Sequence, residues 1–258
     1  MPTPTDPALD EVAWPRWPAG WSGWSASTID LIRIPLPTDG AIVPATVGEL
    51  SPDEVVRAER YLVEPPRRQF VTTRRALRRL CGAILSLDPR EVLIEFTQFG
   101  KPAIAAAQNP HGLAFNVSHS GAWAAIAIGW QRRIGVDLEA VKPQLNWRGL
   151  AGRFFAEGEQ QQLAELPEPL QPHGFYRVWT GKEAYMKATG LGMSFSLKDF
   201  TVAADPRVTP QVLDVVGQPE EAARWHGAAF APAADVFGTL LWDNGPAEVR
   251  QWTWSTDS

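Results

Sequence analysis

The sequence has 258 residues, of which 45% are hydrophobic and 21% are charged. This length is enough for one large domain or two small ones, and the mixed composition is typical of a globular protein. The net charge of −5 argues against binding of bulk nucleic acid, although it allows a local basic patch. We find no apolar run of about 18 residues and no signal-peptide pattern, so we expect a cytoplasmic protein without a membrane span.

Residues 1–26 are rich in Pro, Gly, Ser and Trp. Proline blocks regular secondary structure, so we expect a Pro/Trp-rich N-terminal segment rather than a helix or a strand. Its tryptophans suggest that it packs against the rest of the protein. Residues 27–36 follow with alternating apolar positions, which predict a strand.

Two helices are predicted after this strand. Ser51 can cap a helix that starts at Pro52 and runs to about residue 62, and Glu54 completes a capping box. Residues 67–85 form the second helix, because they repeat apolar residues at helical spacing after a Pro-Pro break. The single cysteine, Cys81, lies on that apolar stripe, so we expect a buried thiol and no internal disulfide.

The second helix also carries six arginines within thirteen residues. In an acidic protein this concentration has two interpretations. The arginines form a solvated helix face, or they form an anion site, because guanidinium groups match phosphate oxygens in a fork geometry. They are Arg67, Arg68, Arg74, Arg75, Arg78 and Arg79.

Several strands are predicted in the middle of the chain, over residues 91–96, 113–117, 122–128 and 134–139. The short loop between the last two indicates an antiparallel hairpin. Asp137 and Glu139 lie at positions i and i+2 of the last strand, so both carboxylates project from one face. Their mutual repulsion would be removed by a divalent cation, and carboxylate oxygens suit Mg²⁺. The alternative is that both residues simply face solvent.

Residues 173–188 predict a helix that is closed by Gly190. Trp179, Glu183 and Lys187 are spaced i, i+4, i+8 and share one face of it, and Lys182 lies in a neighbouring row. Taken alone, Glu183 and Lys187 are an ordinary helix ion pair, worth only about 0.2–0.5 kcal/mol.

The remaining segments predict an α+β fold. Helices are expected over residues 147–155 and from about residue 157 to 166. The strands after them are expected to form one antiparallel sheet. The pattern is compatible with a loose duplication into an N-terminal α+β half, residues 27–132, and a C-terminal α+β half, residues 133–258, that carries the metal and catalytic residues. The strands expected in the last sheet cover residues 200–203, 211–216, 224–230, 236–242 and 249–254.

Three segments stand out when they are taken together. They are the loop Asn116-Val117-Ser118-His119-Ser120-Gly121, the strand Gly135-Val136-Asp137-Leu138-Glu139 and the helix Trp179-Thr180-Gly181-Lys182-Glu183-Ala184-Tyr185-Met186-Lys187. In this order and spacing they resemble the Sfp-type 4′-phosphopantetheinyl transferases. The turn Gly100-Lys101-Pro102 and the Arg153-Phe154-Phe155 segment followed by Glu159 also match the family pattern. The resemblance covers roughly residues 48–200, and the second and third segments are highly specific in combination.

The resemblance implies two similar α+β halves with the active site in the cleft between them. It also implies a Mg²⁺-dependent reaction in which coenzyme A donates its 4′-phosphopantetheine arm to a serine of an apo acyl or peptidyl carrier protein and 3′,5′-ADP leaves. The attacking serine comes from the carrier, so the enzyme needs no nucleophile of its own. The resemblance favours a monomer, and it leaves open whether the carrier serves fatty-acid, polyketide or nonribosomal peptide synthesis.

The same resemblance implies roles for individual residues. Asp137, Glu139 and Glu159 are expected to hold Mg²⁺ together with pyrophosphate oxygens. Glu183 is expected to be the general base, directly or through a metal-bound water, and Lys187 to stabilise the pyrophosphate charge and assist the leaving group. The residues expected to bind coenzyme A are Arg57, Arg74, Lys101, Ser118, His119, Lys182 and Lys187.

The chain departs from the family pattern just after Ser51-Pro52, and three other functions are possible alternatives. Family members often carry a basic residue soon after Ser-Pro, whereas Asp53 and Glu54 stand there in this chain and Arg57 is the first cation. A serine hydrolase is excluded because Asn116, not glycine, stands two residues before Ser118. A silent coenzyme A- or carrier-binding module would need a lost base or metal ligand, and the sequence shows no such loss. A Mg²⁺-dependent pyrophosphohydrolase would need a further acid cluster to place a water nucleophile, and we find none in the sequence.

Overall fold

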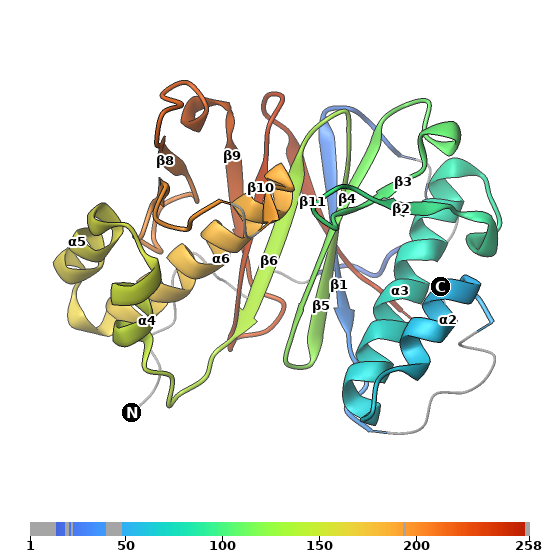
Figure 1. Ribbon diagram of the computed structural model, residues 1–258, viewed down its shortest axis with the longest axis horizontal. Coiled ribbons are helices and arrows are strands. Elements are labelled where there is room, and N and C mark those ends of the chain that lie inside the picture. The colour runs from blue at the N-terminus through green and yellow to red at the C-terminus, as the bar shows by residue number, and fades with distance from the viewer. Residues whose placement is uncertain (1–13, 19–20, 22, 40–47, 193–194, 256–258) are drawn as a thin grey trace.

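The computed structural model describes residues 14–18, 21, 23–39, 48–192 and 195–255 (Figure 1). Helices and strands are mixed along the chain, which confirms the expected α+β class. The elements up to residue 132 are β1 (Thr28–Pro35), α2 (Pro52–Glu59), α3 (Glu64–Leu85), β2 (Ile94–Phe96), β3 (Pro102–Ile104), β4 (Leu113–Ser120) and β5 (Trp123–Trp130). The later elements are β6 (Ile134–Ala140), α4 (Trp147–Phe154), α5 (Glu157–Glu165), α6 (Gln171–Thr189), β7 (Phe200–Val202), β8 (Val212–Val215), β9 (His226–Phe230), β10 (Val236–Trp242) and β11 (Glu248–Thr253).

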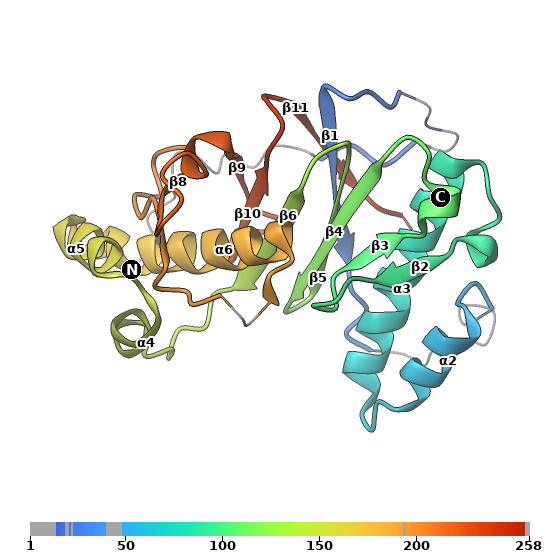
Figure 2. The ribbon, with the colours of Figure 1, turned by 45° about the horizontal axis from the view of Figure 1, so that its top comes forward.

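Two larger sheets lie side by side in the middle of the molecule (Figure 1). One has the strand order β11-β1-β5-β4, and the other has the order β6-β10-β9. Helices α2 and α3 lie on one side of this arrangement, and α4, α5 and α6 lie on the other, as the turned view also shows (Figure 2). Strands β2 and β3 form a small separate hairpin, and so do β7 and β8.

The expectation of one antiparallel sheet for the five C-terminal strands is wrong. Strand β11 instead crosses to the first sheet, where it pairs in parallel with β1. Buried Asp30 of β1 explains this pairing, because its carboxylate accepts hydrogen bonds from Arg250 Nη2 at 2.6 Å and from Trp252 Nε1 at 2.7 Å. The end of the described chain thus completes the sheet with which the chain begins.

The predicted antiparallel hairpin of β5 and β6 is also wrong. Strand β5 pairs with β1 and β4, whereas β6 pairs with β10 in the other sheet. The tight loop between them therefore connects two sheets instead of two paired strands. Val136 and Leu138 of β6 face the core, since both are almost completely buried.

The N-terminal helices follow the predicted pattern with shifted ends. The backbone N–H of Ser51 donates to Glu54 Oε2 at 3.1 Å, as expected for the capping box. Helix α3 begins at Glu64, before the two prolines, because proline is tolerated in the first helical turn where its missing N–H has no partner to lose. Cys81 is fully buried in the core beneath α3, as predicted.

The described part of the N-terminal segment packs on the body through its tryptophans, as predicted. Trp17 is buried, and its backbone N–H donates to Thr253 O at 2.9 Å on β11. Its ring lies 5.4–5.6 Å from those of Trp24 and Trp252. The expectation for residues 1–13 lies outside the described residues. Among the described residues, no helix is long and apolar enough to cross a membrane.

Candidate active site

The two sheets meet at β4 and β6. Here side chains of β4, rather than its backbone, accept hydrogen bonds from the backbone N–H groups of β6. Asn116 Oδ1 accepts a hydrogen bond from Val136 N at 2.8 Å, and Ser118 and Ser120 accept from Leu138 N and Ala140 N at 3.4 and 3.1 Å. These three residues alternate along β4, so their side chains lie on one face of it. The expected carboxylates of β6 therefore sit at the seam of the two sheets.

Asp137 is the most enclosed of these carboxylates. Its Oδ1 accepts hydrogen bonds from Lys187 Nζ at 2.6 Å and from Ser118 Oγ at 2.8 Å. Its Oδ2 is buried and has no hydrogen-bond partner among the described residues. Burial raises the pKa of Asp137, while the ammonium of Lys187 opposes that rise.

Glu139 and His119 lie beside Asp137. The hydroxyl of Ser120 donates to Glu139 Oε2 at 2.8 Å. The pKa of His119 is lowered by burial and by the nearby Lys187, and the negative charges of Asp137 and Glu139 act in the opposite direction. The structure thus brings His119 into the same electrostatic environment as both carboxylates.

Glu183 projects from α6 into this group. Its pKa is raised by burial and by the negative charges of Asp137 and Glu139, and lowered by Lys187. The close approach of α6 to β6 depends on Gly135, where an added Cβ would stand 1.9 Å from Ala184 O. Three carboxylates and one ammonium therefore share a site between β6 and α6.

A cavity of about 720 Å³ opens next to Glu183 and Lys187. It is lined by apolar groups from three parts of the chain, with several cations among them. The apolar lining residues are Phe99, Phe154, Trp179, Met186, Phe195 and Leu197, and the cationic ones are Lys101, Arg153, Lys187 and Lys198. This lining can hold a flexible, partly apolar chain that ends in an anionic group.

Lys101 lines the cavity, but its ammonium is engaged with backbone carbonyls. Its Nζ donates to Ala188 O at 2.7 Å and to Ile134 O at 3.2 Å. It thereby ties the β2–β3 hairpin to the end of α6 and to the start of β6. Burial, with a further contribution from Arg133, lowers the pKa of Lys101 to about 8.

Two expected site residues form a separate buried pair. Glu159 and Lys182 are 0% and 1% exposed, and their charged groups lie 2.7 Å apart. Glu159 also accepts from Ala156 N and Val202 N, and Lys182 donates to Leu197 O and Phe200 O. The structure therefore does not bring Glu159 to Asp137 and Glu139, or Lys182 to the cavity lining.

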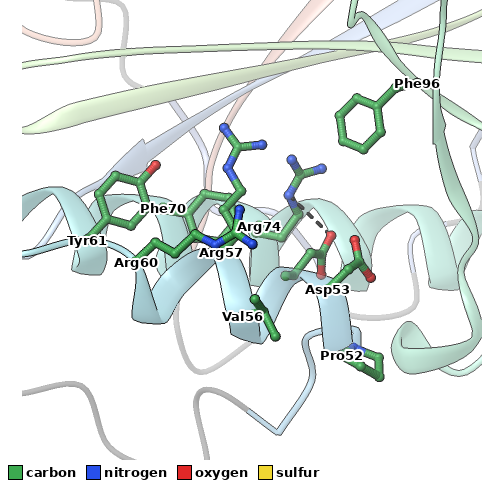
Figure 3. Close-up of a pocket in the computed structure, with 10 residues that line it drawn as sticks. Pro52, Asp53, Val56, Arg57, Arg60, Tyr61, Phe70, Arg74 and Phe96 are labelled. Atoms are coloured by element: carbon green, nitrogen blue, oxygen red, sulfur yellow. Dashed lines mark ion pairs between the residues drawn. The ribbon is translucent and has the colours of Figure 1, made fainter.

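Arg57 and Arg74 line a second pocket, of about 850 Å³, between α2, α3 and the β2–β3 hairpin. Figure 3 shows them with Arg60 between the rings of Tyr61 and Phe96. Burial lowers the pKa of Arg74, and its ion pair with Glu54, at 3.3 Å, opposes this.

Most arginines of α3 are paired within the protein, so the six form neither a fully solvated face nor one common anion site. Glu49 pairs with Arg75 and Arg79 at 2.7 and 2.8 Å, and Glu54 pairs with Arg78 as well as Arg74. Glu54 therefore neutralises two arginines of α3. Of the six arginines, only Arg74 lines the second pocket.

The sequence interpretation missed Asn116, Ser120 and Arg60. The alternation of Asn116, Ser118 and Ser120 was the available signal for the first two, because it places three polar side chains on one face of a strand. Arg60 lies three residues after Arg57 on the same helical face, which was the signal for it.

Comparison with known proteins shows the family to which the chain is similar. A model described as the 4′-phosphopantetheinyl transferase superfamily matches residues 133–236, and one described as the N-terminal part of a 4′-phosphopantetheinyl transferase matches residues 40–131. The 4′-phosphopantetheinyl transferase HetI of Nostoc sp. is 37% identical over 178 residues, which are 69% of this chain and 75% of HetI. This chain belongs to the 4′-phosphopantetheinyl transferase superfamily.

Other transferases of this superfamily match over shorter lengths. A putative 4′-phosphopantetheinyl transferase of Synechocystis sp. is 38% identical over 161 residues, which are 62% of this chain and 65% of that protein. The 4′-phosphopantetheinyl transferase Sfp of Bacillus subtilis is 34% identical over 145 residues, 52% of this chain and 62% of Sfp. The chain thus spans slightly less than two thirds of these two relatives. The expected family and enzyme class are confirmed.

Proposed function

We propose that this transferase moves the 4′-phosphopantetheine arm of coenzyme A to a serine of an apo acyl or peptidyl carrier protein, with Mg²⁺, and releases 3′,5′-ADP. The observation that carries this proposal is the convergence of Asp137, Glu139 and Glu183 with Lys187 beside a partly apolar cavity. Carboxylates and an ammonium in one enclosed site suit a metal-bound polyanion, because each charge then has an opposite partner.

Two observations at the seam support the proposal of a magnesium ion. Asp137 Oδ2 is a buried carboxylate oxygen without a partner in the described chain, and the charges of Asp137 and Glu139 raise the pKa of Glu183. A hard cation held by oxygen ligands would satisfy all three groups. Within the described residues no cluster of three or more His, Cys, Asp or Glu has a ready metal-binding arrangement, and Lys187 supplies the counter-charge to Asp137. When bound, Mg²⁺ would act as a Lewis acid on the pyrophosphate.

We therefore propose Asp137, Glu139 and Glu183 as the metal-holding residues. Glu159, which the resemblance implied as the third ligand, is less suitable, because both of its oxygens already accept hydrogen bonds and its side chain is fully buried. Glu183 thus has two proposed roles, as a ligand and as the group that receives the proton of the carrier serine, directly or through a metal-bound water.

The chemistry assigned to the protein is proton transfer and charge stabilisation. The carrier serine oxygen bonds to the phosphorus that bears the pantetheine arm, and its proton passes to Glu183. The bond from that phosphorus to the bridging oxygen breaks, and its electron pair stays with 3′,5′-ADP. Lys187, in contact with Asp137 at 2.6 Å, stabilises the negative charge that develops on the leaving group.

Coenzyme A is proposed to span both pockets. The apolar lining near Trp179 and Phe195 suits the pantetheine arm, and the arginines of the second pocket suit the 3′-phosphate. Arg57 and Arg74 remain the proposed 3′-phosphate ligands, and Arg60 joins them. Ser118, His119 and Lys101 stay proposed neighbours of the phosphates, although Ser118 and His119 line neither pocket and the ammonium of Lys101 already donates to backbone. Lys182 is assigned to the buried pair with Glu159.

We propose that the enzyme acts in the cytoplasm as a single chain, with a carrier protein as its partner. The fully buried thiol of Cys81 and the absence of any second cysteine are compatible with a reducing compartment.

The metal and the leaving group can be tested in one assay. The enzyme is incubated with coenzyme A and an apo carrier, with Mg²⁺ or with a chelator, and 3′,5′-ADP is quantified by chromatography. We expect 3′,5′-ADP to form only with Mg²⁺, and Asp137→Asn to lose most of the rate while a control, Asp214→Asn at an exposed position of β8, keeps it. Equal product with the chelator would contradict the metal, and release of a different nucleotide would contradict the proposed bond cleavage.

A further inference from the structure

We propose that Ser120 is a positioning residue, which turns the carboxylate of Glu139 toward Asp137 and Glu183 from a hydroxyl anchored on the backbone of β6. This inference deepens the proposed function and rests on it, because the role concerns the site proposed for Mg²⁺. Ser120 is not proposed to touch coenzyme A or the reacting atoms.

The hydroxyl of Ser120 has two directed hydrogen bonds. Its oxygen accepts from Ala140 N at 3.1 Å, and its proton goes to Glu139 Oε2 at 2.8 Å. A serine hydroxyl carries one proton, so the first bond orients the oxygen and leaves the proton for the carboxylate. The orientation of Glu139 is thus tied to the backbone of its own strand through a residue of β4.

The same arrangement occurs two residues earlier on both β4 and β6. Ser118 Oγ accepts from Leu138 N at 3.4 Å and donates to Asp137 Oδ1 at 2.8 Å. Each carboxylate of β6 therefore has its own serine on β4, with the same separation of 19 residues along the chain. This repetition indicates that the pattern serves the carboxylates, because hydrogen bonding of the β6 backbone alone would not require a hydroxyl proton.

The two carboxylates differ in how strongly they depend on their serines. Asp137 is also held by the ammonium of Lys187 at 2.6 Å. In the described part of the chain, by contrast, Glu139 has no ion pair, and its one hydrogen-bond donor is Ser120. Glu139 is half-buried and is repelled by the charges of Asp137 and Glu183. Without the Ser120 hydroxyl, its carboxylate is free to turn away from them into solvent.

Direct binding of Mn²⁺, followed by electron paramagnetic resonance of the free ion in the presence of coenzyme A, tests this role without any turnover. Removing a group that orients a metal ligand typically weakens metal binding by about 10–100-fold. We expect Ser120→Ala to weaken Mn²⁺ binding in this range and Ser120→Thr, which keeps the hydroxyl, to restore most of it. Ser27→Ala, at an exposed serine before β1, is the control and should bind as the parent does.

A kinetic measurement separates positioning from damage to the fold. Ser120→Ala should raise the Mg²⁺ concentration that gives half the maximal rate, while kcat at saturating Mg²⁺ stays within a few-fold of the parent. Equal Mn²⁺ affinity in Ser120→Ala and the parent overturns the inference and leaves the proposed function intact. Loss of affinity in Ser120→Thr as large as in Ser120→Ala also overturns it, since the hydroxyl would then not be the cause. A parent enzyme that binds no Mn²⁺ overturns both proposals.

Discussion

Charge around Asp137 is balanced by very few groups. Lys187 is its one ion-pair partner among the described residues, and Glu139 and Glu183 add two further negative charges close by. In the sequence, Glu183 and Lys187 look like an ordinary ion pair on one helix face. In the structure, Lys187 pairs with Asp137 of β6. The pKa of Glu183 is raised by burial and by the charges of Asp137 and Glu139, which suits its proposed role in proton transfer.

Replacement of Glu183 tests its proposed role. We expect Glu183→Gln to lower turnover by roughly 10²–10⁴-fold, because the amide can neither accept the serine proton nor hold a cation as strongly. Coenzyme A binding, measured by calorimetry without Mg²⁺, should stay near normal. Glu165→Gln, at an exposed position of α5, is the matched control. A turnover equal to that of the control would remove Glu183 from the mechanism.

Glu159 and Lys182 are expected to matter for stability rather than for metal binding. Glu159→Gln leaves the buried ammonium of Lys182 without its charge partner, and breaking such a pair costs about 3–5 kcal/mol. The free energy of unfolding in urea should fall by this order, while Mn²⁺ affinity of the folded protein is unchanged. A normal unfolding free energy combined with weaker Mn²⁺ binding would restore Glu159 as a metal ligand.

At the scale of residues, the sequence predicted the identity of the candidate site residues better than their positions in the fold. Asp137, Glu139, Glu183 and Lys187 were predicted as one constellation, and the structure brings them together. Glu159 resembled a third acid by its distance along the chain, but its partners Ala156, Val202 and Lys182 are decided by packing of α5 against α6 and β7. Spacing in the sequence does not reveal which acid is enclosed by such contacts.

At the scale of elements, the site depends on how closely α6 approaches β6. An added Cβ at Gly135 would stand 1.9 Å from Ala184 O and 2.6 Å from Ala188 N, which no side-chain movement relieves. The two elements that carry the carboxylates would have to separate. The sequence contains this glycine but gives no sign that a helix backbone rests on it.

Gly135→Ala should therefore harm stability and activity together. Overpacking of a filled interior costs about 1–3 kcal/mol, and a backbone contact belongs at the upper end of that range. Thermal unfolding and turnover measure both effects. The control is Gly152→Ala in α4, where a Cβ meets nothing within 4 Å and alanine stabilises a helix by up to about 1 kcal/mol. Equal behaviour of the two variants would contradict the close contact.

Lys101 links three elements and should make stability depend on pH. Its pKa falls from an ordinary 10.5 to about 8 in the folded protein, chiefly through burial, while Asp243 acts in the opposite direction. Between these values the unfolded chain binds more protons than the folded one, so the stability contributed by this group rises with pH.

Urea unfolding of the parent and of Lys101→Met across this range measures the effect. The difference in unfolding free energy should move in favour of the parent as the pH rises from about 8 toward 10.5. Lys198→Met, at an exposed lysine of the cavity wall, is measured alongside as a lysine-to-methionine change outside the buried contact. A flat difference for Lys101→Met would contradict the shifted pKa.

At the scale of the whole molecule, fold class and family could be predicted from sequence, but strand partners could not. Local alternation identifies β11 as a strand, whereas its pairing with β1 depends on Asp30, Arg250 and Trp252, which lie about 220 residues apart in sequence. The seam of β4 and β6 could not be placed for the same reason. The alternation of Asn116, Ser118 and Ser120 puts three polar side chains on one face of β4, but it does not show that they bond to β6. The division into halves at residue 132 stays a prediction.

The central claim is transfer of the phosphopantetheine arm to a carrier serine, and intact-protein mass spectrometry of the carrier tests it most directly. The enzyme is incubated with coenzyme A, Mg²⁺ and a panel of apo carriers from fatty-acid, polyketide and nonribosomal systems. We predict a gain of about 340 Da on at least one carrier, absent when the carrier serine is changed to alanine. No gain on any carrier, with coenzyme A shown to bind the enzyme, would contradict the account.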